Sequence, residues 1–177
     1  ISGGKIDIKA EGDGISAGST LQSDVAEITI NAGGGSGNAS NSSSEFYGGF
    51  MGAKPAEGTD SDSAEDESST SMKGIKTDGS ALISGGKITI NSADDSIHIG
   101  NSITIDGGTF ELASGDDAIH AELLLTVTDC DMNISTSYEG LEAKEIYVKG
   151  GNIVLNASDD GLNASGGTDA SGTTGGR

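Results

Sequence analysis

The chain has 177 residues, of which 28 are Asp or Glu and only nine are Lys or Arg, so its net charge is −19 at pH 7. This charge argues against direct binding to nucleic acid or to an anionic membrane surface, and it favours multivalent cations as partners. One cysteine excludes an intrachain disulfide, and no apolar run approaches the ~20 residues that a membrane-spanning helix needs.

A short phrase recurs along the chain. It opens with Gly, or with Cys in one copy, and reaches an acid nine residues later; the last four copies lie 22, 22 and 21 residues apart. The five pairs are Gly4 and Asp13, Gly86 and Asp95, Gly108 and Asp117, Cys130 and Glu139, and Gly151 and Asp160. A repeat of nearly constant length predicts one supersecondary unit stacked on copies of itself, so that equivalent residues form columns.

The first copy shows the strands that each unit is expected to contain. Ile6 and Ile8 alternate with polar residues, and Ile15 follows the acid Asp13. Later copies add a third alternating pair before the Gly, which indicates three short strands per copy. Three strands in ~22 residues cannot form a self-sufficient sheet, but they can form one coil of a parallel β-helix, in which equivalent strands pair ~4.8 Å apart. The sequence therefore predicts an all-β parallel β-helix (solenoid), with about 22 residues and three short strands per coil. An antiparallel sandwich would not need equivalent residues at constant spacing.

The second copy is interrupted by an insertion at about residues 33–72, and Ile75 resumes the pattern. We expect a single β-helix domain over residues 1–165, broken by this insertion, and a flexible Gly-, Ser- and Thr-rich tail over residues 166–177.

The insertion is rich in Gly, Ser and Asn and then in acids, a composition that is typical of a disordered loop. Because it leaves and rejoins the repeat at the acid turn, we expect it beside the carboxylates. Phe46, Tyr47 and Phe50 fall within it, and they support the alternative of a platform on which a sugar stacks.

Stacking the copies places acids in two neighbouring columns at the turn. Carboxylates ~4.8 Å apart repel by roughly 1 kcal/mol per pair in water, and by several-fold more at a lower effective dielectric. Calcium would offset this repulsion because the ion accepts about six to eight oxygen ligands. The sequence predicts calcium between the pairs Asp94 and Asp95, and Asp116 and Asp117, with a further site around Glu139, Glu142, Asp159 and Asp160. Asp residues that serve only the turns are the alternative.

The outward position just past the turn forms another column, which reads Ser16, Lys76, His98, His120, Glu142 and Asn163. His98 and His120 should be neighbours with their nitrogens facing outward. We predict that they bind ligand together with Lys76, Tyr138, Phe46 and Tyr47. A transition-metal site at the two histidines is the alternative, although Asp-rich surroundings suit hard cations better.

The phrases KGIKTDGSALISGGKITI, SADDSIHIGNSITIDGGTF, SYEGLEAKEIYVKGG and ASDDGLNAS resemble a bacterial extracellular carbohydrate-binding family of right-handed parallel β-helices. The resemblance covers nearly all of the chain outside the insertion. It implies a fold like that of polysaccharide lyases, bound calcium, and binding of plant cell-wall polysaccharide that includes acidic pectin-type sugars. It also implies that the eight turn acids named above are the calcium ligands. The chain departs from the pattern at Tyr138, which replaces a first acid, and in the first repeat, where only Asp13 remains.

The leading functional hypothesis is a non-catalytic, calcium-stabilised carbohydrate-binding module at the cell surface or outside the cell. We expect it to bind acidic plant cell-wall polysaccharide. A structural solenoid of a calcium-dependent fibre or adhesin stalk is one alternative, because unpaired strand edges at the ends favour end-to-end self-association. A calcium-dependent polysaccharide lyase is the other, with Lys76 or Lys144 as the base. The single Arg, at the C-terminus, argues against a lyase.

Overall fold

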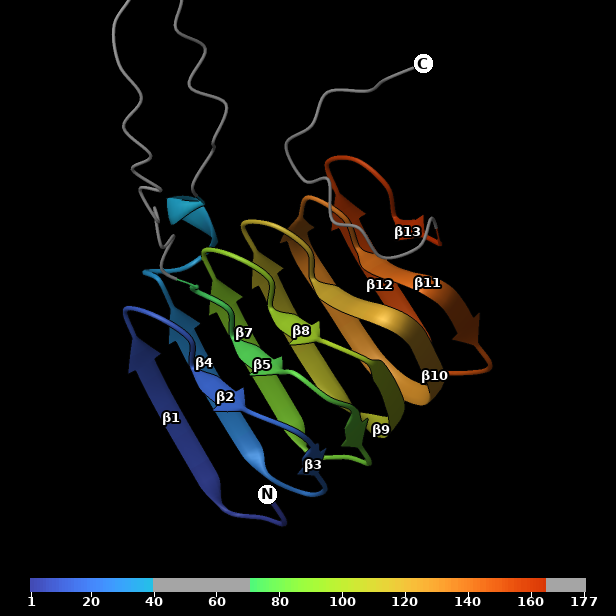
Figure 1. Cartoon of the computed structure of the whole chain (residues 1–177), viewed down its shortest axis with the longest axis horizontal. Helices are drawn as coiled ribbons and strands as arrows, with labels where there is room; N and C mark the ends of the chain where they lie inside the picture. The colour runs from blue at the N-terminus through green and yellow to red at the C-terminus, as the bar shows by residue number, and fades with distance from the viewer. Residues whose placement is uncertain (40–70, 165–177) are drawn as a thin grey trace, which may run out of the picture.

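The computed structural model describes residues 1–39 and 71–164, whose strands join in one 13-stranded sheet. The described pairings are all parallel, and partners are typically 22 residues apart, as in Ile97 with Ile119. Figure 1 shows the coils following one another from the N-terminal to the C-terminal strands. This arrangement confirms the predicted all-β parallel solenoid, with about six turns of about 22 residues.

The strands are β1 (Lys5–Ala10), β2 (Ile15–Ala17), β3 (Leu21–Ser23), β4 (Glu27–Ala32), β5 (Ile75–Thr77), β6 (Ala81–Ile83), β7 (Lys87–Ser92), β8 (Ile97–Ile99), β9 (Ser102–Ser114), β10 (Ile119–Ser137), β11 (Leu141–Val148), β12 (Asn152–Ala157) and β13 (Leu162–Asn163). The strands β1 to β8 have three or six residues each, and the longest strands are β9 and β10, with 13 and 19 residues. The helical content of the described residues is one 3-10 turn, η1 (Ser36–Asn38). None of these residues lies in a helix that could span a membrane.

Three strands form each coil, and each belongs to one of three faces of the solenoid. The strands β1, β4 and β7 continue in register into the ends of β9 and β10 and into β12. The strands β2, β5 and β8 continue into the start of β10, then β11 and β13. The strands β3 and β6 continue into the start of β9, the middle of β10 and the end of β11, which form the third face. In β9 and β10 the predicted short strands are fused, because pairing continues around the corners through register shifts.

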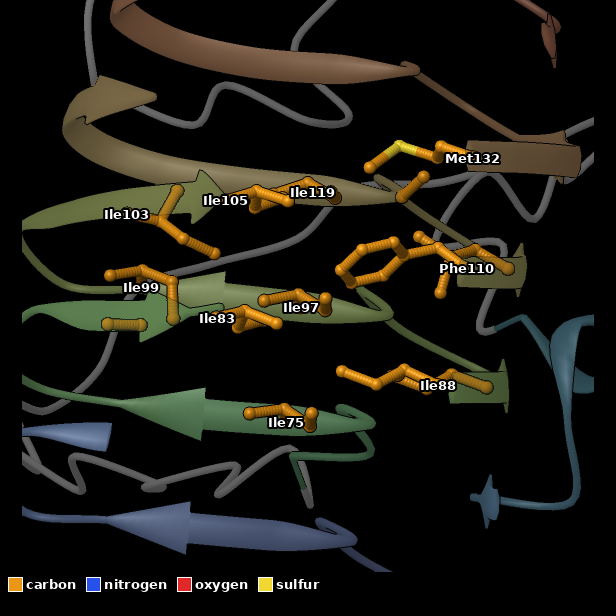
Figure 2. Close-up of a cluster of buried hydrophobic side chains, with 14 of the residues drawn as sticks. Ile75, Ile83, Ile88, Ile97, Ile99, Ile103, Ile105, Phe110, Ile119 and Met132 are labelled. Atoms are coloured by element: carbon orange, nitrogen blue, oxygen red, sulfur yellow. The ribbon is translucent and has the colours of Figure 1, made fainter. Parts of the chain in front are cut away.

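The interior is filled by the inward-pointing residues of all three faces. Ile75, Ile97 and Ile119 stack in register, and Phe110 fills the space across from them (Figure 2). These side chains are at most 1% exposed, and burying one contributes about 1.5–3 kcal/mol. The β-branched side chains suit strand geometry, so the Ile spacing in the sequence directly specifies this core.

Glycine is required where successive coils approach closely at the turn. A Cβ on Gly74 would lie 2.5 Å from the carbonyl oxygen of Ser96 and 2.4 Å from the side chain of Ile90. No other residue fits there without moving the backbone. The coils therefore touch at this edge, which brings their turn residues into contact.

The insertion leaves the solenoid directly after β4 and rejoins it just before β5. Gly33, Gly34 and Gly35 all have positive φ values, of 60°, 82° and 90°, which turn the chain away from the sheet. The backbone N–H of Ser36 donates to Asn91 Oδ1 at 2.8 Å. The predicted platform residues Phe46 and Tyr47 lie outside the described residues, as does the predicted tail.

The last described coil leaves core positions uncovered. Val148 and Leu162 pair in register with the buried Val127 and Leu141, but they are 48% and 55% exposed. The outward-facing Val154 is 58% exposed. With Leu141, Ile153 and Leu155 they line a hollow of about 570 Å³. The end-to-end self-association expected from the sequence stays a prediction.

We expect Ile97→Ala to lower the free energy of unfolding by about 2–5 kcal/mol, because it leaves a cavity in the stacked core. The outward-facing Leu82, on β6, is 37% exposed, and Leu82→Ala should change it by about 0.5 kcal/mol or less. Urea unfolding followed by circular dichroism measures both. Equal losses in the two variants would contradict the described core.

Candidate functional site

The edge where β1, β4 and β7 end carries one column of turn residues (Figure 1). Its register is set by backbone hydrogen bonds between coils, such as Gly74 N to Asp95 O and Ser96 N to Asp117 O, both 2.9 Å. The column, called the turn column below, consists of Asp13, Lys73, Asp95, Asp117, Glu139 and Asp160. The acids of the sequence repeat thus lie one above another, but a lysine occupies the second coil.

The aspartates of the turn column hold the next coil in place through their Oδ1 atoms. Asp13 accepts the backbone N–H of Lys73 at 2.9 Å, Asp95 that of Asp117 at 3.1 Å, and Asp117 that of Glu139 at 3.1 Å. Each bond satisfies a backbone donor that the strands do not use. This ladder explains the recurrence of Asp without any metal, so a metal site needs further evidence.

Lys73 supplies positive charge within the column. Its Nζ lies 3.0 Å from Asp94 Oδ1 and 2.8 Å from Asp95 Oδ2, and its side chain is 16% exposed. Burial alone would lower the pKa of Lys73, but Asp95 and then Asp94 raise it above the usual range. Lys73 is not among the site residues predicted from the sequence. The signal was present, because Lys73 precedes Gly74 and Ile75 as Asp13 precedes a Gly and an Ile.

Asp95 is held by Lys73, by His98 and by the backbone N–H of Asp117. Burial would raise its pKa, but the hydrogen bond from His98 and the charge of Lys73 bring it down to about 2. The His98 Nδ1 atom lies 2.8 Å from Asp95 Oδ2. At neutral pH Asp95 is therefore an ionised group whose partners belong to the protein itself.

The two histidines are neighbours, as their spacing predicts. Their rings stack with centroids 4.8 Å apart at an angle of 16°. They do not share one environment, however. The side chain of His98 is 21% exposed and that of His120 only 2%, so His120 keeps its place in the outward column but is covered rather than open to solvent. His120 is covered because carboxylate side chains approach it from its own coil and from the next.

His120 lies in a buried cluster with Asp117 and Glu142. Its Nδ1 is 2.7 Å from Glu142 Oε2 and 3.5 Å from Asp117 Oδ2. Burial would lower the pKa of His120, but Asp117, Asp95 and Glu142 raise it to about 9. Burial raises the pKa of Asp117 to about 8, against the hydrogen bond from His120. Without a bound cation, the cluster thus retains protons at neutral pH.

Two groups of side chains in the described parts of the chain could hold a metal ion. One is Asp94, Asp95 and Asp116, and the other is Asp117, His120 and Glu142. In each group the ligand atoms lie within 4.8 Å of one another. The first offers only oxygens and suits a hard cation such as calcium, although Lys73 Nζ already contacts two of its carboxylates.

The remaining predicted acids are placed differently. Glu139 accepts hydrogen bonds from Asn163 Nδ2 to both of its carboxylate oxygens, at 2.8 and 2.9 Å. Asp159 and Asp160 are exposed. Glu139 thus has a protein partner, whereas Asp159 and Asp160 face solvent. The second calcium site predicted around these residues remains a prediction.

The other predicted ligand-binding residues lie along the same edge. Lys76 pairs in register with His98, on the coil before it. Tyr138 is 40% exposed and stands in the first-acid column, where its N–H donates to the carbonyl of Asp116 at 2.8 Å. Lys144, the second base considered for a lyase, is exposed on β11.

We expect the chelated protein to lose stability as the pH rises from about 6.5 to about 9. The folded His120 keeps its proton up to a pKa of about 9, whereas an unfolded histidine loses it near 6.5, so unfolding releases a proton in this window. Asp117 acts in the same direction up to pH 8. Urea unfolding at several pH values measures the slope, which His120→Gln should flatten more than His98→Gln. Stability that rises with pH in this window would contradict the assignment.

No curated protein and no solved structure shows significant similarity to this chain. A family model described as carbohydrate-binding domain-containing protein matches it over residues 1–118 and again over residues 103–176. Together the two matches span almost the whole chain, so the chain belongs to this family of carbohydrate-binding domain-containing proteins.

Proposed function

We propose that this chain is a non-catalytic module, at the cell surface or outside the cell, that binds an acidic polysaccharide along its turn edge with the help of calcium. The observation that carries the proposal is the convergence of Asp94, Asp95 and Asp116 from two adjacent coils at this edge. The family description supplies carbohydrate as the ligand class. The polymer would run parallel to the solenoid axis, so that successive sugars meet equivalent residues of successive coils.

Calcium is proposed because the edge and an acidic polymer carry the same sign of charge. The net charge of −19 would repel a polyuronate unless a cation lay between them. The Asp94, Asp95 and Asp116 cluster offers oxygen ligands from two coils, which suits an ion of high and irregular coordination. Bound calcium would join these coils and leave a coordination position for a sugar carboxylate.

Lys73 is the internal competitor for this cation. Its ammonium group neutralises Asp94 and Asp95 in the absence of metal, at distances of 3.0 and 2.8 Å. Calcium can use both carboxylates only if Lys73 moves away, so its affinity should depend on this residue.

Exposed side chains near the carboxylates would contact the sugar itself. Tyr138 lies between the coils of Asp116 and Asp159, and its exposed ring offers an apolar face for stacking. His98 and Lys76 supply hydrogen-bond donors one position past the turn. We propose Phe46 and Tyr47, from the insertion, as a further stacking surface.

Calcium titration of the chelated chain should raise the midpoint of thermal unfolding, and magnesium should have a much smaller effect.

Asp116→Asn should weaken calcium binding, because it removes one anionic oxygen donor of the cluster. Lys73→Met should destabilise the chelated protein but strengthen its calcium binding, because the competing ammonium is gone. Calorimetry measures the affinities.

The matched control is Asp131→Asn, which removes an exposed acid on β10, away from the turn edge. It should leave calcium binding unchanged. No response of the unfolding midpoint to calcium in either the wild type or Lys73→Met would contradict the calcium site.

Affinity electrophoresis should show retardation by polygalacturonate in the presence of calcium, less in chelator, and little with a neutral glucan. Tyr138→Ala should weaken the retardation because it removes the exposed ring, whereas Tyr147→Ala, on the third face, should not. Equal retardation by neutral and acidic polymers would contradict the proposed substrate class.

Formation of unsaturated product would instead indicate a lyase, and Lys76→Ala and Lys144→Ala would then identify its base.

A further inference from the structure

The buried cluster of Asp117, His120 and Glu142 differs chemically from the oxygen-only cluster beside it. These three residues are 2%, 1% and 6% exposed. A histidine nitrogen faces one carboxylate from its own coil and another from the next, because Asp117 precedes β10 and Glu142 lies on β11. Nitrogen together with carboxylate oxygen is a donor set that favours borderline transition metals over calcium.

The second ring nitrogen of His120 provides independent evidence. Nε2 is buried and, among the described residues, has no hydrogen-bond partner. The nearest carboxylate oxygen recorded for it, Oε1 of Glu122, lies 3.6 Å away, too far for a hydrogen bond. A buried polar atom without a partner costs about 1–3 kcal/mol, so its retention needs a reason.

A metal ion on Nδ1 would supply that reason. It would occupy Nδ1 in place of a proton and leave the ring proton on Nε2, which lies 3.6 Å from Glu122 Oε1. A metal-bound histidine whose other nitrogen donates to a carboxylate is the usual second-layer arrangement around protein metal sites. A small closure of the 3.6 Å gap would complete it.

The distances suit a tetrahedral ion. Ligand atoms about 2.1 Å from such an ion lie about 3.4 Å from one another. The separation between His120 Nδ1 and Asp117 Oδ2 is 3.5 Å, which already fits. The separation between Nδ1 and Glu142 Oε2 is 2.7 Å, a hydrogen-bond distance that must open when the ion replaces the proton. His98 stacks on the His120 ring but contributes no ligand atom to this cluster.

We propose that Asp117, His120 and Glu142 form a zinc site that joins two coils of the solenoid and is separate from the proposed calcium cluster. Asp117 and Glu142, which the sequence analysis assigned to calcium, would be ligands of this second ion. Three protein ligands leave a fourth position for water or for an oxygen of a bound ligand. The site does not depend on the proposed carbohydrate function.

Zinc titration of the chelated full chain tests the site. Calorimetry should detect a zinc site of one ion per chain that excess calcium does not fill, and thermal unfolding should shift to a higher midpoint. The chain has only two histidines, so nitrogen NMR of the imidazoles can follow each ring separately. Zinc should shift the Nδ1 resonance of His120 and leave the Nδ1 resonance of His98, which lies 2.8 Å from Asp95 Oδ2, unchanged.

His120→Gln should abolish this binding, and His98→Gln is the matched control that should retain it. Glu122→Gln should weaken zinc binding by roughly 10- to 100-fold, because its carboxylate orients the ring without touching the metal. Circular dichroism checks the fold of each variant. The NMR measurement on the wild type keeps the test valid if His120→Gln does not fold.

Three results would overturn the proposal. One is zinc binding that survives His120→Gln in a folded protein. Another is equal loss of binding in both histidine variants, which would indicate a superficial histidine pair. The third is displacement of zinc by calcium at comparable concentration, which would make the two clusters one calcium site.

Discussion

The structure depends on parallel pairing between strands about 22 residues apart. This register places each residue against its equivalent on the next coil, so one inward isoleucine becomes a column of isoleucines, as with Ile75, Ile97 and Ile119. The same rule holds at the turns, where Gly74 allows two backbones to meet. In a solenoid, equivalent residues of successive coils therefore lie next to one another. This stacking builds the apolar core, but it also brings like charges together at the edge.

The turn column shows how such repulsion is relieved within the protein. Oδ1 of Asp95 and of Asp117 each accepts a backbone N–H from the following coil. The remaining charge is offset by cationic or protonated side chains, with Lys73 beside Asp95 and His120 beside Asp117. Repeated carboxylates in a solenoid are thus structural elements first, and a metal has to compete with partners that the chain provides.

This competition divides the edge into two chemical environments. Asp94, Asp95 and Asp116 offer oxygens that a lysine already neutralises, whereas Asp117 and Glu142 surround a buried imidazole. The chain belongs to a family described as carbohydrate-binding domain-containing proteins, and the exposed Tyr138 stands on the same edge as both clusters. A cation at either cluster would tie adjacent coils together, so ligand binding and the stability of the solenoid would be linked.

The sequence by itself determined the fold, the coil length and the columns, because hydrophobic spacing and Gly turns act locally and repeat. From it we predicted that Asp94, Asp95, Asp116 and Asp117 lie together and that His98 and His120 are neighbours. Only the tertiary structure decided what surrounds each group. Lys73 joined the acid column because the coil resumes in register after the insertion, and His120 became buried because Glu142 covers it from the next coil. Both results depend on contacts between coils, which a repeat pattern positions but whose side-chain partners it does not specify.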